Sequence, residues 1–425
     1  MFQTFKNAWK IAELRSKIIF TLVIVLLYRL GSVIPVPFVN AEALSTAFDN
    51  QSLFAYFNIL SGQAFSQATL FALSISPYIT SSIVIQLLTI AIPALERLSK
   101  EGPEGRKKLT QITRYCTVGL ALLTAIGYYT YLRNSLGILT DNSLFAGAVI
   151  IACYCAGASI IMWLAEKINE YGIGNGISII LFANITASLP SILYAAFVRA
   201  DVGKLGFLIP VITVVILLAM ILFIVYVTNA ERRLPVQYAK RQVGRRMYGG
   251  QNTYIPMKLN MSGVMPIIFA SSIAAIPQTI ALIFPPKTNG IWSKIVNVFS
   301  STSPVYMVIY FLLIIGFAYF YLAISFNPVE VANNLKNNGG SVPGIRPGKP
   351  TVDYITKILG RITLIGAIFL GLVATLPLIV GFISEDLAGL AFGGSSLLIL
   401  VSVAIETEKE IEAQMTMRHY KGFLE

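Results

Sequence analysis

Long apolar stretches, separated by short polar segments, run through the chain from one end to the other. The hydrocarbon core of a bilayer is about 30 Å thick, so a helix needs roughly 20 apolar residues to cross it. This pattern predicts an all-α integral membrane protein with ten transmembrane spans. The predicted spans lie near 18–34, 68–92, 115–132, 144–165, 174–197, 207–229, 261–284, 304–326, 360–383 and 389–405.

Composition and charge agree with this class. Of the 425 residues, 56% are hydrophobic and only 12% are charged, whereas soluble domains carry about 25% charged residues. The net charge of +12 comes mostly from alternate connections and from both ends of the chain, so the positive-inside rule places both termini in the cytoplasm. No cleavable signal peptide is expected, because no small-residue cleavage site follows the first apolar run.

Five spans in each half have a geometric consequence. After an odd number of crossings the second half begins on the opposite side, so repeated halves must be inverted. We therefore expect two halves, 1–203 and 204–425. Short matches favour a repeat over chance similarity between apolar segments. The matching pairs are Pro77 with Ile79 in span 2, Pro266 with Ile268 in span 7, Gly176 with Leu181 in span 5, and Gly394 with Ile399 in span 10.

The segment 54–67, "FAYFNILSGQAFSQ", is apolar at near-helical spacing but too short and too polar to cross a bilayer. Such segments are usually re-entrant or interfacial. An ordinary helix in an external loop is the alternative.

The chain offers little to build a catalytic or metal site from. The glycines of "YGIGNGISIIL" (171–181) resemble a phosphate loop, but no strand precedes them and no acidic ribose partner follows. His419 is the only histidine, and Cys116, Cys153 and Cys155 lie in apolar runs without a C-x-x-C pair. We expect no enzyme activity, no metal and no cofactor.

Charged residues are scarce within the spans. Arg29, Glu166 and Glu406 lie at span ends, where structural pairing is the expected role. Ion-coupled carriers need ionisable groups within the membrane, so the sequence argues against a secondary transporter of a small solute. That class remains the alternative, and a lipid scramblase or insertase is a third.

Spans 2 and 7 are rich in proline and in small hydroxyl residues. Proline kinks helices, and small residues allow close but separable packing, so these spans are predicted to move against each other. The residues concerned are Pro77, Ser81 and Ser82 in span 2, and Pro266, Ser271, Ser272 and Pro277 in span 7, while Pro190 lies in span 5.

Two long connections, 231–258 and 328–357, are expected in the cytoplasm. The first is denser in Arg and Lys than orientation requires, which suits phosphate backbones or an acidic partner, although lipid headgroups are an equal alternative. The second holds Arg346 between Gly and Pro residues, as a docking residue or as a solvated turn.

Five motifs, in order along essentially the whole chain, resemble the SecY family of protein-translocation channel subunits. They are "ALSISPYITSSIVIQLL" (72–88), "GIGNGISIILFANI" (172–185), "YAKRQVGRRMY" (238–248), "LNMSGVMPIIFASS" (259–272) and "VPGIRPGKPT" (342–351).

The resemblance implies two inverted halves around an hourglass pore that passes unfolded preproteins and releases membrane segments sideways. The implied pore ring is Ile75, Ile79, Ile177, Leu181, Ile268 and Ile399. The implied plug is Asn58, Ile59, Leu60, Ser61, Gly62, Gln63, Ala64 and Phe65. The implied lateral gate is Pro77, Ser81, Ser82, Gln86, Pro266, Ser271 and Ser272.

The resemblance also implies partners. These are the small subunits SecE and SecG, the motor ATPase SecA, the ribosome, signal peptides, preproteins and membrane lipids, all at the cytoplasmic membrane of a bacterium. The implied docking residues are Arg232, Arg233, Lys240, Arg241, Arg245, Arg246 and Arg346. Leu181, where isoleucine is more usual, and Gln63, where a small residue is common, depart from the family pattern.

Overall fold

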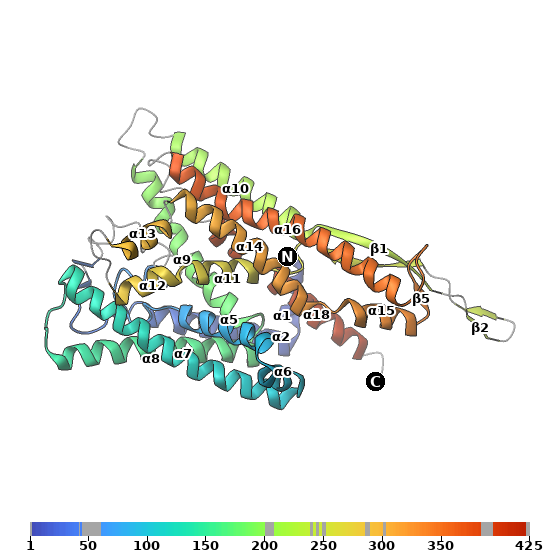
Figure 1. The fold of residues 1–425 in the computed structure, drawn as a ribbon, viewed down its shortest axis with the longest axis horizontal. Helices are drawn as coiled ribbons and strands as arrows, with labels where there is room; N and C mark the ends of the chain where they lie inside the picture. Colours follow the sequence, from blue (N-terminus) through green and yellow to red (C-terminus); the bar gives the residue numbers. More distant parts are fainter. Residues whose placement is uncertain are drawn as a thin grey trace.

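A computed structural model describes residues 2–41, 43–44, 61–199, 208–238, 241–243, 246–248, 252–284, 290–300, 303–383 and 394–421. Helices dominate it (Figure 1). The helices of the first half are α1 (Phe2–Lys10), α2 (Ala12–Gly31), α5 (Ser76–Ala91), α6 (Pro93–Lys100), α7 (Pro103–Tyr131), the π-helical η2 (Leu132–Leu136), α8 (Leu144–Tyr171) and α9 (Gly176–Arg199). Those of the second half are α10 (Leu208–Asn229), α11 (Met265–Ala274), α12 (Ile276–Ile283), α13 (Ile291–Val298), α14 (Pro304–Ser325), α15 (Pro328–Asn337), α16 (Lys349–Ile383) and α18 (Gly394–Lys421).

Each of the ten predicted spans overlaps at least one of these helices. By length and hydropathy alone, four described helical stretches could cross a membrane, within 103–134, 144–171, 304–337 and 349–379. The α5–α6 pair, bent by 101°, passes the same test as one broken span. The all-helical membrane fold is therefore confirmed, while the count of ten crossings stays a prediction.

Two predicted spans differ from a single straight helix. In the stretch 68–92, the residues before Ser76 form turns, and in the stretch 261–284 the helix breaks at Ala275. Pro77, Pro266 and Pro277 each lie in the first turn of a helix, where the missing N–H costs no hydrogen bond. Pro77 and Pro266 start their helices rather than kinking them, whereas Pro277 lies directly after the break between α11 and α12, where a proline interrupts the helix.

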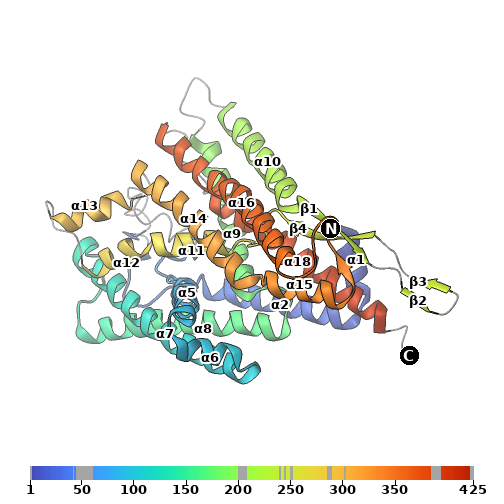
Figure 2. The same ribbon diagram turned by 45° about the vertical axis from the view of Figure 1, so that its right-hand side comes forward.

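The helices form two groups that meet along a central seam. α2, α5, α7 and α8 pack together, as do α14, α16 and α18, with α10 beside α18. Both views place the first group at one side of the molecule and α10, α14 and α16 at the other (Figures 1 and 2). Across the seam α5 packs on α11, α7 on α12 and α9 on α18. The largest hydrophobic cluster draws side chains from both groups.

Two glycine contacts recur in the two halves. A Cβ at Gly176, where α9 begins, would overlap the carbonyl oxygen of Ala165 in α8, and a Cβ at Gly394, where α18 begins, would overlap that of Val373 in α16. Likewise a Cβ at Gly157 in α8 would overlap the carbonyl oxygen of Leu70, and one at Gly366 in α16 that of Leu259. Leu70 lies six residues before the start of α5, and Leu259 lies six residues before the start of α11. These equivalent close approaches support inverted repeats, and they give the glycines a packing role.

The connection 231–258 is a β-hairpin, which the sequence analysis did not predict. β1 (Glu231–Tyr238) pairs antiparallel with β4 (Asn252–Lys258) from Glu231↔Lys258 to Gln237↔Asn252. β5 (Gly340–Ser341) adds a third strand, so the sheet order is β4-β1-β5. The short strands β2 (Arg241–Val243) and β3 (Arg246–Tyr248) pair further along the hairpin, which projects from one end of the molecule (Figure 1).

The hairpin shares a small hydrophobic core with α15 and α16. Leu234 and Val236 alternate with exposed residues along β1, as expected for a strand with one buried face. They pack with Leu335 of α15 and with Ile355 and Leu359 of α16. The two long connections therefore form one folded unit, which we call the cytoplasmic unit after the location predicted for both connections.

Replacing Leu335 with alanine should loosen the cytoplasmic unit. Leu335 is 7% exposed, and truncating a buried leucine usually costs about 2–5 kcal/mol. We expect faster trypsin cleavage within 231–258 in membrane vesicles. Val329→Ala, on the same helix but 51% exposed, is the matched control and should leave cleavage unchanged. Equal cleavage of both variants would show that the core does not hold the hairpin.

Candidate functional site

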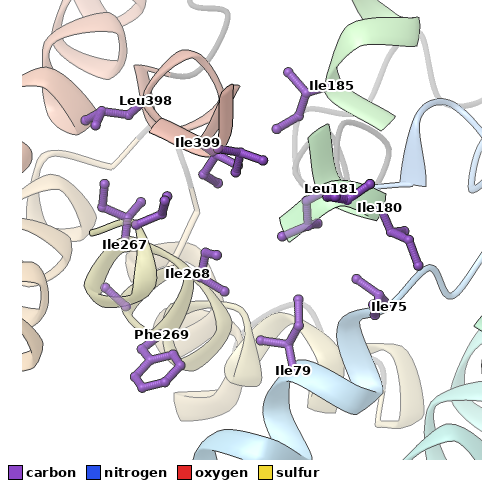
Figure 3. Close-up of a cluster of buried hydrophobic side chains, with 14 of the residues drawn as sticks. Ile75, Ile79, Ile180, Leu181, Ile185, Ile267, Ile268, Phe269, Leu398 and Ile399 are labelled. Carbon is purple, nitrogen blue, oxygen red and sulfur yellow. The ribbon is translucent and has the colours of Figure 1, made fainter. Parts of the chain in front are cut away.

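Five predicted ring residues lie together in the central cluster. Ile75, Ile79, Leu181, Ile268 and Ile399 belong to it, each at most 4% exposed. They come from four segments: Ile75 immediately precedes α5, Ile79 lies in α5, and the others lie in α9, α11 and α18. Figure 3 shows these side chains pointing towards one common space. Helices from both halves thus supply one apolar constriction.

The sixth predicted residue, Ile177, packs against the edge of this cluster and is only partly buried. Ile185, two turns further along α9, is fully buried and lies near Leu181 and Ile399 (Figure 3). The sequence analysis did not include it. Ile177 and Ile185 are each four residues from Leu181, so helical spacing alone could not choose between them.

The predicted plug is described only in its second part, since Asn58, Ile59 and Leu60 lie outside the described residues. The structure buries Ser61, Ala64 and Phe65. The hydroxyl of Tyr128 in α7 donates to the Phe65 carbonyl at 2.6 Å, and the two rings are 4.5 Å apart. Phe65 therefore anchors the end of this segment in the cluster around α7 and α8, away from the ring.

Arg29 connects α2, α9 and the plug segment. Its guanidinium donates to the carbonyl of Ala183 in α9. A Cβ at Gly62 would lie 3.0 Å from the Arg29 Nη1 atom, so a side chain there would crowd the guanidinium. Gln63, with φ of 71°, continues the left-handed turn. Arg29 thus has a structural role, and its partner is a backbone carbonyl.

Glu166, a second predicted span-end charge, forms an ion pair. The Arg114 guanidinium of α7 contacts both Glu166 carboxylate oxygens of α8, through Nε to Oε1 at 2.9 Å and Nη2 to Oε2 at 2.8 Å. This bidentate pair joins neighbouring helices of the first half. The structural role predicted for Glu166 is confirmed.

The predicted gate residues divide by their partners. Ser81 donates to the Thr113 carbonyl of α7 at 2.9 Å, so it holds α5 to its neighbour in the same half. Ser271 and Ser272 both donate to the Ile268 carbonyl of their own helix. The described hydrogen bonds of these serines therefore do not cross the α5–α11 seam.

A cavity of about 810 Å³ opens beside this seam, between α5, α6, α7 and α14. Ser82 and Gln86 line it, with the Gln86 amide donating to the Ser82 hydroxyl at 3.4 Å. Phe320 and Ile324 of α14 and Ile85 of α5 make most of its wall apolar. Ser82 and Gln86 are predicted gate residues, and α14, which forms the opposite wall, corresponds to the predicted span 8 (304–326).

The predicted docking residues lie in the cytoplasmic unit. Arg232 and Arg233 are exposed on β1, Arg241 and Arg246 lie in β2 and β3, and Arg346 is exposed in the turn before α16, while Lys240 and Arg245 lie outside the described residues. Arg233 is the most constrained. Its Nε contacts Glu231 Oε1 at 2.8 Å, and the guanidinium lies 4.8 Å from the centre of the Tyr254 ring.

Apolar side chains from both groups of helices meet between them, as expected for a helical membrane channel. Comparisons with known proteins agree. The SecY family model matches residues 69–408. Protein translocase subunit SecY of Streptomyces galbus is 46% identical over 442 residues, covering 100% of both chains, and that of Mycobacterium bovis is 42% identical over 447 residues, again covering 100% of both. The chain belongs to the SecY family.

Solved structures show the same fold. One described as a protein conducting channel matches with a TM-score of 0.68 at 17% identity, covering 94% of this chain and 92% of that chain. Sec61 in a canine ribosome–channel complex matches with a TM-score of 0.63 at 17% identity and the same coverage. Family membership does not support the small-solute transporter considered from the sequence.

Replacing Tyr128 with phenylalanine should loosen the plug anchor. The change removes the donor to the buried Phe65 carbonyl, and an unpaired buried carbonyl costs about 1–3 kcal/mol. We expect a lower unfolding temperature and faster thiol labelling of a Ser61→Cys probe. Tyr115→Phe, on the same helix but 78% exposed, is the control. Unchanged labelling in Tyr128→Phe would show that the anchor does not restrain the segment.

Proposed function

We propose that this chain is the central, channel-forming subunit of a protein translocase in the cytoplasmic membrane of a bacterium. It passes unfolded secretory proteins across the membrane and releases membrane segments sideways into the lipid. The observation that carries this proposal is the apolar ring, to which α5, α9, α11 and α18 contribute from both halves. The names of its full-length relatives support it.

An apolar constriction suits this task physically. A narrow apolar ring dewets, so hydrated ions do not pass while the pore rests. Branched aliphatic side chains change rotamer readily and make no directional bonds across the pore. An extended polypeptide can therefore displace Ile79, Leu181 and Ile268 one at a time, and the ring closes again behind it.

The apolar cavity beside the α5–α11 seam supports lateral release. Its wall of Ile85, Phe320 and Ile324 suits the apolar helix of a signal peptide or membrane segment. Because the hydroxyl groups of Ser271 and Ser272 are satisfied within α11, opening the seam there breaks apolar contacts without leaving them unpaired.

Energy for transport must come from partners in this proposal. The described residues hold no group of three or more His, Cys, Asp or Glu that could bind a metal. We propose that SecA or a translating ribosome docks on the cytoplasmic unit, and that SecE and SecG complete the complex. The basic residues of the hairpin support docking, as does the likeness in fold to Sec61 and Ssh1 channels solved with ribosomes.

Transport into vesicles tests the proposal directly. The chain, reconstituted with SecE, SecG and SecA, should move a signal-bearing precursor into a protease-protected space in the presence of ATP. A precursor that reaches only the bilayer, with no soluble substrate crossing, would favour an insertase or scramblase. No protection of any substrate would contradict the proposal.

The docking residues are tested in the same assay. Arg241→Glu with Arg246→Glu should weaken binding of SecA or ribosomes roughly tenfold or more, since opposing charges are replaced by like charges. Lys107→Glu with Lys108→Glu makes the same charge change at exposed positions of α7 and should leave binding unchanged. Equal loss in both variants would point to general electrostatics rather than docking on the hairpin.

The ring is tested by conductance. Ile268→Ser places a hydroxyl in the constriction and should raise resting ion conductance in planar bilayers about tenfold, because a polar ring stays wet. Ile268→Leu keeps the apolar volume and should stay near the wild-type value. Equal conductance of all three proteins would remove Ile268 from the seal.

A further inference from the structure

A polar chamber of about 210 Å³ lies next to the ring. Ser178 of α9, Met265 of α11 and Ser402 of α18 line it, and each is three residues from a ring residue on its own helix. Those ring residues are Leu181, Ile268 and Ile399, respectively. The chamber therefore lies about one helical turn from the constriction.

Three buried polar atoms that line this chamber have no hydrogen-bond partner among the described residues. They are Thr228 Oγ1, Asn260 Nδ2 and Ser402 Oγ, and all three residues are more than nine-tenths buried. Buried polar atoms without a protein partner usually bind water, and a water molecule takes about 30 Å³. The chamber has room for several, so it is a polar compartment beside an apolar seal.

Glu406 of α18 reaches across this chamber to the start of α11. A Cβ at Gly263 would lie 2.5 Å from Glu406 Oε1, so the carboxylate packs directly on the backbone there. Gly263 has a φ of +62° and precedes Val264, the N-cap residue of α11, which provides no side-chain cap. The first N–H groups of a helix favour a nearby anion, and Glu406 supplies one from another helix.

Two lysines lie close enough to act electrostatically on this carboxylate. Burial raises the pKa of Glu406, while the charges of Lys258 and Lys409 oppose that rise and Glu410 adds to it. The Lys409 ammonium also donates to the Asn229 side chain at the end of α10, at 3.0 Å. Glu406 thus lies where α10, α18, β4 and α11 come together.

We propose that Glu406 is a positioning residue for the ring. This proposal rests on the proposed sealing role of that ring. Its carboxylate holds the start of α11 against α18, so that Ile268 and Ile399 meet in the constriction. Ile268 lies in the first turn of α11, so any shift of the helix start moves it directly. Lys258 ends β4, and only residues 259–264 link the cytoplasmic unit to α11. Glu406 therefore also fixes the short link between the proposed docking surface and the helix that carries Ile268.

Cross-linking tests the geometry. Cysteines replace Ile268 and Ile399, and the natural Cys116, Cys153 and Cys155 become serine, in the chain assembled with its partner subunits. A short bismaleimide should join the pair. Glu406→Gln should slow this reaction roughly two- to tenfold, the range expected from losing a carboxylate at a helix start. Glu406→Asp should restore part of the rate, which a loss of packing alone would not explain.

Glu410→Gln is the matched control, because it removes the same charge one turn further along α18 at a residue that, unlike Glu406, lies outside contact with Gly263; both side chains are exposed. It should leave cross-linking unchanged. Gly263→Ala is a second route to the same effect, since its methyl group would displace the carboxylate. The double variant with Glu406→Gln should add little to either change, as expected for two changes to one contact. Gly263→Ala alone tests the proposal if Glu406→Gln fails to fold.

The outcomes separate this inference from the proposed function. Unchanged cross-linking in both Glu406→Gln and Gly263→Ala would overturn the positioning role, whatever the protein transports. Slower cross-linking with a rise in resting ion conductance supports both the positioning role and the seal. Slower cross-linking with unchanged conductance would support the positioning of α11 by Glu406 and contradict the sealing role of the ring.

Discussion

The structure depends on one constraint: apolar side chains from four separate helices must meet at a single point between two halves. Each pore helix begins close to that point. α5 begins directly after Ile75, α11 three residues before Ile268, α9 five residues before Leu181, and α18 five residues before Ile399. A side chain in the first two turns follows any small rotation of its helix start. The ring is therefore held by whatever fixes those starts, which explains the close glycine contacts at Gly176 and Gly394.

This arrangement separates two physical tasks. In the proposed channel, apolar contact closes the constriction and the α5–α11 seam, so opening either leaves the described hydrogen bonds of Ser81, Ser271 and Ser272 intact. Polar contacts hold the parts that should stay together, such as Ser81 to α7 and Arg114 to Glu166 within the first half. Removing the partner of the buried Glu166 carboxylate is costly, whereas parting apolar surfaces into lipid is cheap because lipid is itself apolar. The distribution of polar contacts thus decides which seam of the molecule separates.

Much of this fold follows from the sequence, because hydropathy over about 20 residues decides which stretches are helices in a membrane. The ring residues Ile79, Leu181, Ile268 and Ile399 could also be predicted from the sequence, since each follows a Pro or Gly that marks a helix start. Spacing could not distinguish Ile177 from Ile185, because their difference in burial arises from packing between helices. The hairpin was missed for a similar reason: only Leu234 and Val236 show the alternation, and their partners Leu335 and Ile355 lie about 100 residues further along the chain.

The longest helix, α16, connects the two regions that this function requires. Near its start, Ile355 and Leu359 pack in the cytoplasmic unit, and further along, Leu370 and Val373 pack in the central cluster around the ring. Val373 is also the residue whose carbonyl closely approaches Gly394, where α18 begins. A partner docked on the cytoplasmic unit, as proposed, would therefore act on α18 through a continuous helix and on α11 through the short link after β4. Both paths end at ring residues of the second half, so binding outside the membrane and closure within it share the same few contacts.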